Sequence, residues 1–134
     1  MMQKVEKLDS DWAKQLTPRQ YAVLREKATE APFSGEYDST FDPGTYKCAA
    51  CDNKLFASKT KFEAHCGWPS FYDAIPGSVE FHDDTRMDVV RIEVTCATCG
   101  GHLGHVFKGE ELGAPIDQRY CINSLSLHFT PDKN

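Results

Sequence analysis

Two C-x-x-C pairs constrain this chain more than any other feature of its sequence. They are Cys48-Ala49-Ala50-Cys51 and Cys96-Ala97-Thr98-Cys99. Each pair brings two thiolates to one tight turn, and four such sulfur atoms make the tetrahedral set that structural zinc prefers. The spacer from Asp52 to Thr95 is longer than in an ordinary zinc ribbon. We therefore predict a metal that joins two distant segments.

Two other uses of these cysteines are open at this point. A redox-active C-x-x-C of the thioredoxin kind expects a neighbouring strand-helix-strand pattern, which this sequence lacks. Iron could take the same four sulfur atoms, because ligand type alone does not separate the two metals. A closed four-sulfur site leaves no position for substrate. We therefore expect one structural zinc per subunit that takes no part in the chemistry.

Length and charge limit the remaining classes. With 134 residues and 40% hydrophobic residues, one domain over 1–134 is expected, with a helical segment over about 1–32 and a β core over about 33–134. The net charge of -5 offers no field to attract phosphates, so we expect no nucleic-acid partner. Charges interrupt the first 14 residues, and no apolar run approaches the roughly 18 residues of a spanning helix. The prediction is a cytoplasmic protein without a membrane partner.

Helices are expected only near the N-terminus. Thr17-Pro18-Arg19-Gln20 has the form of a capping box, and apolar residues follow at helical spacing. This pattern predicts a helix from about Thr17 to Thr29 that ends before Pro32. A shorter helix is expected from Asp11 to Gln15.

Short strands and loops are expected from Phe33 onward, because glycine and proline interrupt the chain often. Alternation predicts one strand over Asp88–Cys96, with valine and isoleucine on one face and polar residues on the other. It predicts another over Tyr120–Phe129. We find no internal repeat and no linker.

Two cysteines remain once four are assigned to the metal: Cys66 and Cys121. Free thiols are often simply small buried hydrophobes. However, the alternation of the last strand, extended backward, places Arg119, Cys121 and Asn123 on one side. A cation there would lower the pKa of Cys121 and favour the reactive thiolate. Cys66 lies in a stretch rich in glycine, proline and aromatic residues, which is typical of a surface loop.

Three further residues could complete a site around these thiols. His102 and His105 could supply proton donors if the loop that carries them folds over the strand of Cys121. Singly, each histidine is more often a hydrogen-bonded structural residue. Trp68 is more often a packing residue than a ligand platform, although a small apolar substrate would favour the second interpretation.

Together these segments resemble the methionine-R-sulfoxide reductases, the MsrB family. The matching segments are Cys48–Cys51, Cys66–Phe71, Cys96–Cys99, Gly101–Phe107 and Arg119–Ser124. The resemblance covers about Phe33 to Phe129. The resemblance implies a mainly β fold of two antiparallel sheets, with short N-terminal helices alongside and a structural four-cysteine zinc site at Cys48, Cys51, Cys96 and Cys99.

The resemblance also implies roles for individual residues. Cys121 matches the nucleophile, and Cys66 matches the resolving cysteine of the two-cysteine type that thioredoxin recycles. Trp68 matches the residue that packs against the substrate's methyl group. The other positions surround the sulfoxide and the thiol: His102, His105, Asn123 and Arg119. The expected substrate contacts are Trp68, His105 and Asn123.

The implied reaction reduces methionine-R-sulfoxide, protein-bound or free, and so repairs oxidised proteins. Cys121 attacks the sulfoxide sulfur, and His105 with help from His102 protonates the departing oxygen. The resulting sulfenic acid condenses with Cys66 to a disulfide, which thioredoxin reopens by exchange. We expect the protein to act as a monomer.

One segment departs from the family pattern. Many relatives carry Asp-Gly directly after His-Val-Phe-x, whereas this chain reads Lys108-Gly109-Glu110-Glu111, so no role is assigned to an acid there. Two other functions stay open. A zinc-ribbon interaction module would explain the metal cysteines but not Cys66 or Cys121. A reductase for another oxidised sulfur compound, or a thiol peroxidase, would use the same chemistry.

Overall fold

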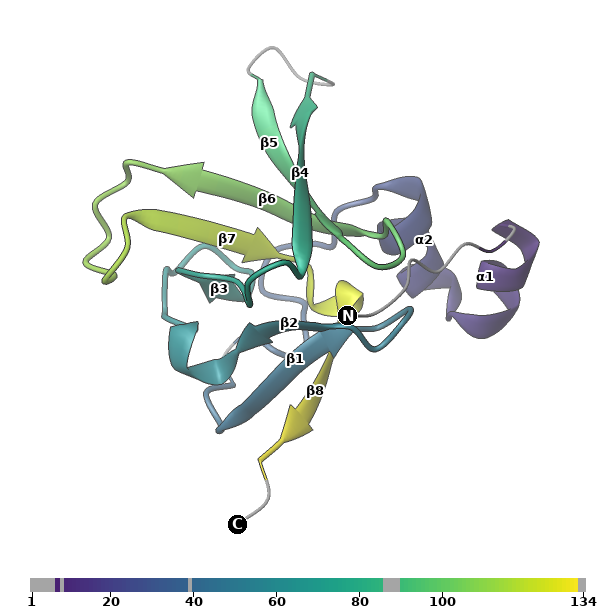
Figure 1. Cartoon of the computed structure of the whole chain (residues 1–134), viewed down its shortest axis with the longest axis horizontal. Helices are drawn as coiled ribbons and strands as arrows, with labels where there is room; N and C mark the ends of the chain where they lie inside the picture. The colour runs from purple at the N-terminus through teal and green to yellow at the C-terminus, as the bar shows by residue number, and fades with distance from the viewer. Residues whose placement is uncertain (1–6, 8, 39, 86–89, 133–134) are drawn as a thin grey trace.

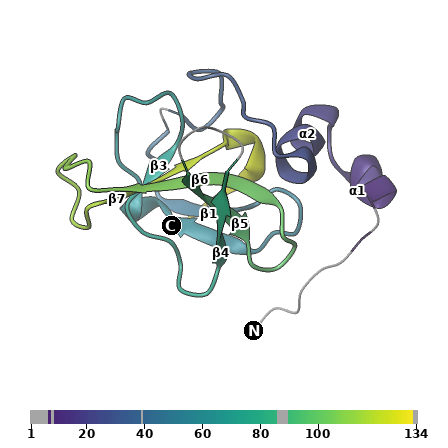
Figure 2. The ribbon, with the colours of Figure 1, turned by 90° about the horizontal axis from the view of Figure 1, so that it is seen from above.

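The structure is a computed structural model that describes residues 7, 9–38, 40–85 and 90–132. Its described strands form two antiparallel sheets, with two short helices to one side (Figures 1 and 2). The smaller sheet has the order β2 (Lys54–Ala57), β1 (Gly44–Cys48), β8 (Leu127–Pro131). The larger has the order β3 (Ser70–Phe71), β7 (Gln118–Ile122), β6 (His102–Lys108), β5 (Arg91–Cys96), β4 (Val79–Asp84). The predicted fold class, mainly β with short N-terminal helices, is confirmed.

Aromatic side chains between the sheets form the centre of the core. The Phe56 and Phe71 rings stack with centroids 4.4 Å apart, and Tyr46 meets Phe71 edge-on at 5.1 Å. Trp12 and Leu24 of the helices join the same cluster of buried side chains. Burying one such large side chain contributes roughly 1.5–3 kcal/mol. The helices are thus held to the sheets by packing.

The capping box at Thr17 is confirmed. Helix α2 covers Pro18–Glu26, the Thr17 hydroxyl accepts from the Gln20 amide at 3.2 Å, and the Gln20 side chain accepts from the Thr17 amide at 3.0 Å. The helix ends three residues before the predicted Thr29. Lys27 adopts a left-handed conformation, and the Ala28 amide bonds back to the Ala22 carbonyl at 2.9 Å, which closes the helix.

Helix α1 covers Asp9–Gln15 and so begins two residues before the predicted Asp11. Neither α1 nor α2 has the length and apolar character that crossing a bilayer requires. Two 3-10 turns complete the described elements: η1 (Ser58–Thr60) and η2 (Ser124–Ser126).

The prediction of one strand over Tyr120–Phe129 is wrong. Strand β7 ends at Ile122, η2 follows, and β8 begins at Leu127 in the other sheet. The chain turns because the Asn123 amide bonds the Leu103 carbonyl at 2.9 Å and the Ser126 amide closes back onto the Asn123 carbonyl at 3.0 Å. A single stretch of alternating apolar and polar residues therefore contributes a strand to each sheet.

The strand predicted over Asp88–Cys96 exists as β5, whose described part begins at Arg91; residues 86–89 lie outside the described residues. Its faces are not simply apolar-in and polar-out. Ile92 is 36% exposed, whereas Glu93 is only 3% exposed. Glu93 is tolerated inside because its carboxylate contacts His102 Nδ1 at 2.7 Å and Lys27 Nζ at 3.3 Å.

The segment Gly101–Phe107 is predicted to be a loop, but all of it after Gly101 belongs to strand β6 at the centre of the larger sheet. The pairing of β5 with β6 passes over Leu103. Residues three apart on a regular strand point to opposite faces. The extra residue reverses this, so His102 and His105 share a face with ring centroids 5.5 Å apart.

Candidate functional site

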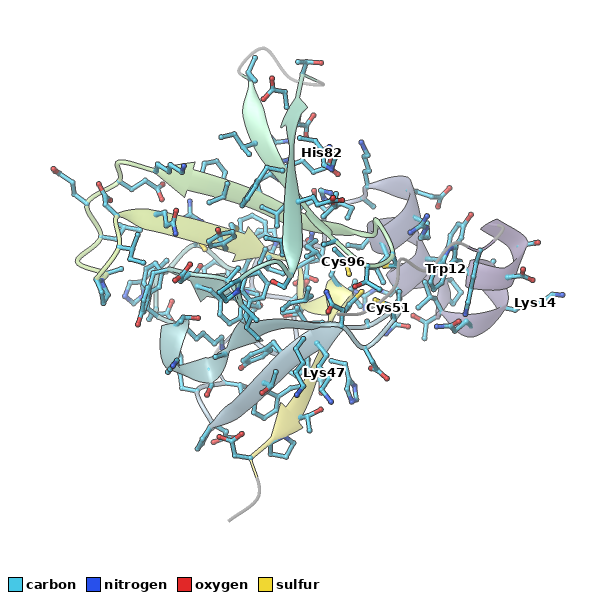
Figure 3. The ribbon with its side chains drawn as sticks, in the orientation of Figure 1. Trp12, Lys14, Lys47, Cys51, His82 and Cys96 are labelled. Atoms are coloured by element: carbon cyan, nitrogen blue, oxygen red, sulfur yellow. The ribbon has the colours of Figure 1, made fainter. Side chains whose placement is uncertain are left out.

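The two C-x-x-C pairs form matching turns at the ends of two strands from different sheets. Cys48 ends β1 and Cys96 ends β5. In each turn the residue after the second cysteine is left-handed, Asp52 with φ 64° and Gly100 with φ 75°. Its amide bonds the first cysteine's carbonyl, at 2.9 Å and 2.8 Å. The sulfur atoms of both turns therefore point to one place (Figure 3).

The four sulfur atoms fit a single metal ion. All lie within 4.8 Å of one another, with Cys48 and Cys99 Sγ 3.7 Å apart and Cys51 and Cys96 Sγ 3.5 Å apart. Tetrahedral bonds of about 2.3 Å to zinc would place sulfur atoms about 3.8 Å apart. The Gly101 amide points at Cys99 Sγ at 3.4 Å, a donor that suits a thiolate. These four residues could hold a metal ion.

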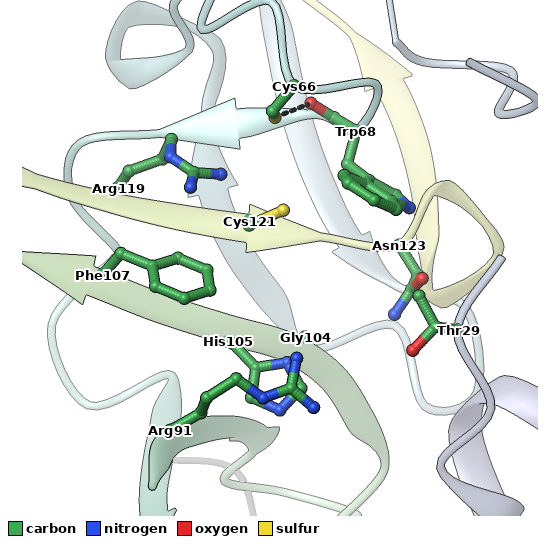
Figure 4. Close-up of a pocket in the computed structure, with 10 residues that line it drawn as sticks. All are labelled: Thr29, Cys66, Trp68, Arg91, Gly104, His105, Phe107, Arg119, Cys121 and Asn123. Carbon is green, nitrogen blue, oxygen red and sulfur yellow. Dashed lines mark hydrogen bonds between the residues drawn. The ribbon is translucent and has the colours of Figure 1, made fainter. Parts of the chain in front are cut away.

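A second site lies on the larger sheet and uses none of the four metal-site cysteines. It is a cavity of about 150 Å³ lined by the residues labelled in Figure 4, which we call the thiol pocket. Because a water takes about 30 Å³ in the liquid, this space suits a small group. Cys66 and the Trp68 indole lie on one side of Cys121, with His105 and Arg91 on the other.

Cys121 lies within a strand, whereas Cys66 lies in a loop. Cys121 lies in β7, paired with Ser70 of β3 on one side and His105 of β6 on the other. Cys66 lies in the segment between η1 and β3, where its sulfur contacts Trp68 O at 3.5 Å and Ser70 Oγ at 3.3 Å. The predicted loop position of Cys66 is confirmed, and both thiols are free.

The two thiols titrate as a pair. A hydrogen bond with the Cys121 thiol is the largest effect that lowers the pKa of Cys66 to about 5, and the charge of Arg119 contributes to the same shift. The hydrogen bond with Cys66, burial and the charge on Cys66 raise the pKa of Cys121 despite Arg119. Arg119 acts on the pKa of Cys121 in the expected downward direction, but the net shift of that pKa is upward. One negative charge is therefore shared between the two sulfur atoms.

Arg119 is fixed by the segment that departs from the family pattern. Its Nε and Nη2 donate to the two carboxylate oxygens of Glu110 at 2.8 Å and 3.1 Å, and its guanidinium lies 4.7 Å from the centre of the Phe107 ring. This bidentate hydrogen bond raises the pKa of Arg119 and lowers that of Glu110. Glu110 thus orients a cation toward both thiols.

The two histidines occupy different positions. His105 lines the thiol pocket, and its Nε2 contacts Asp84 Oδ2 at 2.8 Å, so a carboxylate supports positive charge on the ring. His102 lies behind it and belongs to a neighbouring hollow beside α2. Burial acts to raise the pKa of Glu93, but the hydrogen bonds and charges of His102 and Lys27 together outweigh it and lower that pKa. His102 is therefore held beside a carboxylate.

Trp68 and Asn123 complete the pocket. The Trp68 Nε1 donates to the Glu30 carbonyl at 3.1 Å, which turns the indole toward the cavity (Figure 4). Asn123 donates from Nδ2 to the Leu103 carbonyl at 3.0 Å and accepts at Oδ1 from the Glu30 amide at 3.1 Å. Both side chains are fixed by the backbone around them.

Six predicted site residues line the thiol pocket: Cys66, Trp68, His105, Arg119, Cys121 and Asn123. His102 lies behind the pocket, beside His105. The sequence did not single out Arg91, Gly104 or Thr29 for the pocket. Gly104 has a detectable signal, because a glycine between two histidines suggests a close backbone approach. A Cβ there would overlap the Cys121 carbonyl oxygen.

The fold and the two sites define a class: a β-sheet protein with a four-cysteine metal cluster and a separate pocket holding a pair of thiols. The family model described as "SelR domain" matches residues 16–131, and the chain belongs to that family. It is 53% identical over 129 residues to "Peptide methionine sulfoxide reductase MsrB" of Agrobacterium fabrum, covering 96% of this chain and 94% of that one. The family resemblance is thereby confirmed.

Other relatives agree. The protein with the same printed name from Methanosarcina mazei is 53% identical, over 98% of this chain and 93% of that one. "Peptide methionine sulfoxide reductase B2, chloroplastic" of Arabidopsis thaliana is 51% identical over 97% of this chain, which spans 63% of that relative. The solved "Yippee-like" domain of Mis18 covers 69% of this chain and is itself fully covered, with TM-score 0.56 and 21% identity. That likeness concerns the fold alone.

Proposed function

We propose that this chain is a peptide-methionine (R)-S-oxide reductase, which returns methionine-R-sulfoxide to methionine. The observation that carries the proposal is the thiol pocket, where a small cavity brings an aromatic ring, a histidine with a carboxylate partner and two thiols together. Membership of the SelR family supports the same activity. A zinc-ribbon module would need none of these groups.

The first step forms a bond between Cys121 and the sulfoxide sulfur. The Cys121 proton moves along the hydrogen bond that this thiol shares with the Cys66 sulfur. His105, supported by Asp84, donates a proton to the sulfoxide oxygen. The oxygen then passes from the substrate sulfur to the Cys121 sulfur, and the bond between the two sulfur atoms breaks. The methionine sulfur has gained two electrons and the Cys121 sulfur has lost two, which leaves methionine and a sulfenic acid on Cys121.

The second step closes a disulfide. Cys66 attacks the Cys121 sulfur, and the sulfenic acid oxygen leaves as water. The proposed roles of the other site residues follow from their places. Trp68 packs against the substrate's methyl group, Asn123 and His105 contact the sulfoxide, Arg119 stabilises the thiol pair's charge, and His102 supports His105.

A dithiol protein of the thioredoxin kind is the proposed reductant, because exchange with a disulfide needs only an accessible sulfur and an attacking thiolate. Zinc is the proposed occupant of the four-cysteine site, which supplies no chemistry and stabilises the fold. The single domain over 1–134 is supported by the core that the helices and sheets share. The monomeric state and the cytoplasmic location stay predictions.

Assays on separated sulfoxide epimers test the proposal. The metal-loaded chain, with a thioredoxin system, should form methionine from the R epimer of a peptide-bound sulfoxide and not from the S epimer. Free methionine sulfoxide in the same assay measures substrate preference. Absence of methionine from both epimers, alongside peroxide reduction, would instead support a thiol peroxidase.

Replacing His105 tests the proposed acid. General acid catalysis is worth roughly 10²- to 10⁴-fold, so His105→Ala should lower the single-turnover rate by about that factor. Alkylation of the thiol pair should continue. His128→Ala is the matched control, because His128 is exposed on β8. A His105→Ala variant with the wild-type rate would exclude the assignment.

A further inference from the structure

Glu30 lies at the point where the chain from α2 meets the thiol pocket, and its backbone holds two pocket side chains. Its amide donates to Asn123 Oδ1 at 3.1 Å, and its carbonyl accepts from Trp68 Nε1 at 3.1 Å. The two bonds use the backbone amide and the backbone carbonyl of the same residue. Any shift of Glu30 would therefore move the indole and the carboxamide together.

The side chain of Glu30 anchors this backbone to the turn beyond Cys121. Its Oε1 accepts from the Leu125 amide at 2.9 Å. Leu125 lies in η2, the turn that directly follows Asn123. The carboxylate therefore fixes the Glu30 segment to the same turn that positions Asn123.

The same segment also holds the loop of the second thiol. The Phe33 amide donates to the Gly67 carbonyl at 2.7 Å. Gly67, with φ 94°, lies so close that an added Cβ would be 2.6 Å from Pro32 Cβ. We call residues Glu30–Phe33 the strap, because they contact the Cys66–Trp68 loop on one side and η2 on the other.

A carboxylate is a costly anchor at this place. Glu30 is only 5% exposed, and its Oε2 has no hydrogen-bond partner among the described residues. Burial raises the pKa of Glu30, with a smaller contribution from Asp38. Gly35 makes room for the group, because a Cβ there would lie 2.5 Å from Oε2. An apolar side chain would fill this position in the core at a lower cost in folding free energy.

We propose that Glu30 is a positioning residue for the thiol pocket: through the strap, its carboxylate sets the orientation of the Trp68 indole and the Asn123 carboxamide. Glu30 contacts neither the sulfoxide nor the thiols. The inference rests on the proposed function for its effect on catalysis. Its effect on Trp68 is independent of any activity.

Trp68 fluorescence tests the proposal directly. Trp12 and Trp68 are the two tryptophans of the chain, so Trp12→Phe leaves Trp68 as the only indole emitter. In that background, Glu30→Ala should shift the emission to longer wavelength and increase quenching by acrylamide. Glu30→Gln keeps an oxygen acceptor for the Leu125 amide and should restore both signals.

Kinetics separate positioning from general destabilisation. A displaced catalytic geometry can cost up to about 10²-fold, and we expect kcat/KM of Glu30→Ala to fall by about tenfold or more. The loss should lie mainly in KM, because Trp68 contacts substrate while Cys121 remains in the sheet. A merely structural role would reduce the active fraction and lower kcat alone.

Glu36→Ala is the matched control, because Glu36 is an exposed carboxylate that lines the same surface pocket as Glu30. It should leave emission and kinetics unchanged. Wild-type Trp68 emission and KM in a folded Glu30→Ala variant would overturn the proposal. If Glu30→Ala does not fold, Glu30→Asp takes its place and is judged by the same two signals. A wild-type chain without reductase activity would refute the proposed function, and the emission would still decide the role of Glu30.

Discussion

Replacing Cys121 by serine is expected to abolish methionine formation, with a loss of about 10³-fold or more in kcat/KM. The serine hydroxyl does not ionise near neutral pH, and no other thiol is held in β7 against the cavity. The variant should still fold and bind its metal, because the four-cysteine site is unchanged. Chromatographic measurement of methionine, with a small dithiol as reductant, gives the readout.

Cys66→Ser is the matched comparison, because it removes the other thiol of the pair. It should form about one equivalent of methionine per chain and then stop when thioredoxin is the reductant. The sulfenic acid on Cys121 then lacks its intramolecular partner. Normal thioredoxin-dependent recycling in this variant would contradict the resolving role. Full activity in Cys121→Ser would contradict the whole assignment.

Loss of the metal site is expected to unfold the protein. Structural zinc contributes about 10–16 kcal/mol to the folding of small zinc-binding peptides, whereas a whole domain is stable by only about 5–15 kcal/mol. The four-cysteine site joins the end of β1 in one sheet to the end of β5 in the other. Cys96→Ala should therefore lose both the metal and the cooperative thermal transition.

Metal analysis and circular dichroism check this expectation. Cys66→Ser serves again as the control, since it also removes one cysteine but should keep one zinc per chain and the wild-type Tm. A metal-free Cys96→Ala variant with an unchanged Tm would show that the ion is dispensable for folding. Intense absorption of visible light by the purified wild-type chain would identify iron in place of zinc.

The metal ligands and the face of Cys121 could be predicted because both depend on local spacing. A C-x-x-C pair has few ways to close a turn, and the two-residue period of a strand places Arg119 and Cys121 alike. The capping box at Thr17 is equally local. The chemical roles of these residues were predicted from the family resemblance, because residue spacing alone does not specify a role.

The rest depends on contacts between distant segments. The alternation around Tyr120–Phe129 continues through the turn at Asn123, so nothing local reveals that two sheets share it. The bulge that places His102 beside His105 depends on pairing with β5. Glu93 looks like a surface residue until its partners from other elements are known.

The contrast between a thiol fixed in a sheet and a thiol in a loop also bears on how such proteins can diverge. Cys121 is bonded to strands on both sides, so a change at its position disturbs three strands at once. Cys66 lies in a loop, where its sulfur contacts Trp68 and Ser70 of the same segment and the Cys121 thiol. A substitution at Cys66 should therefore disturb the fold less than one at Cys121. Under the proposed function, the loop thiol and its reductant can change while the oxygen-transfer step is kept.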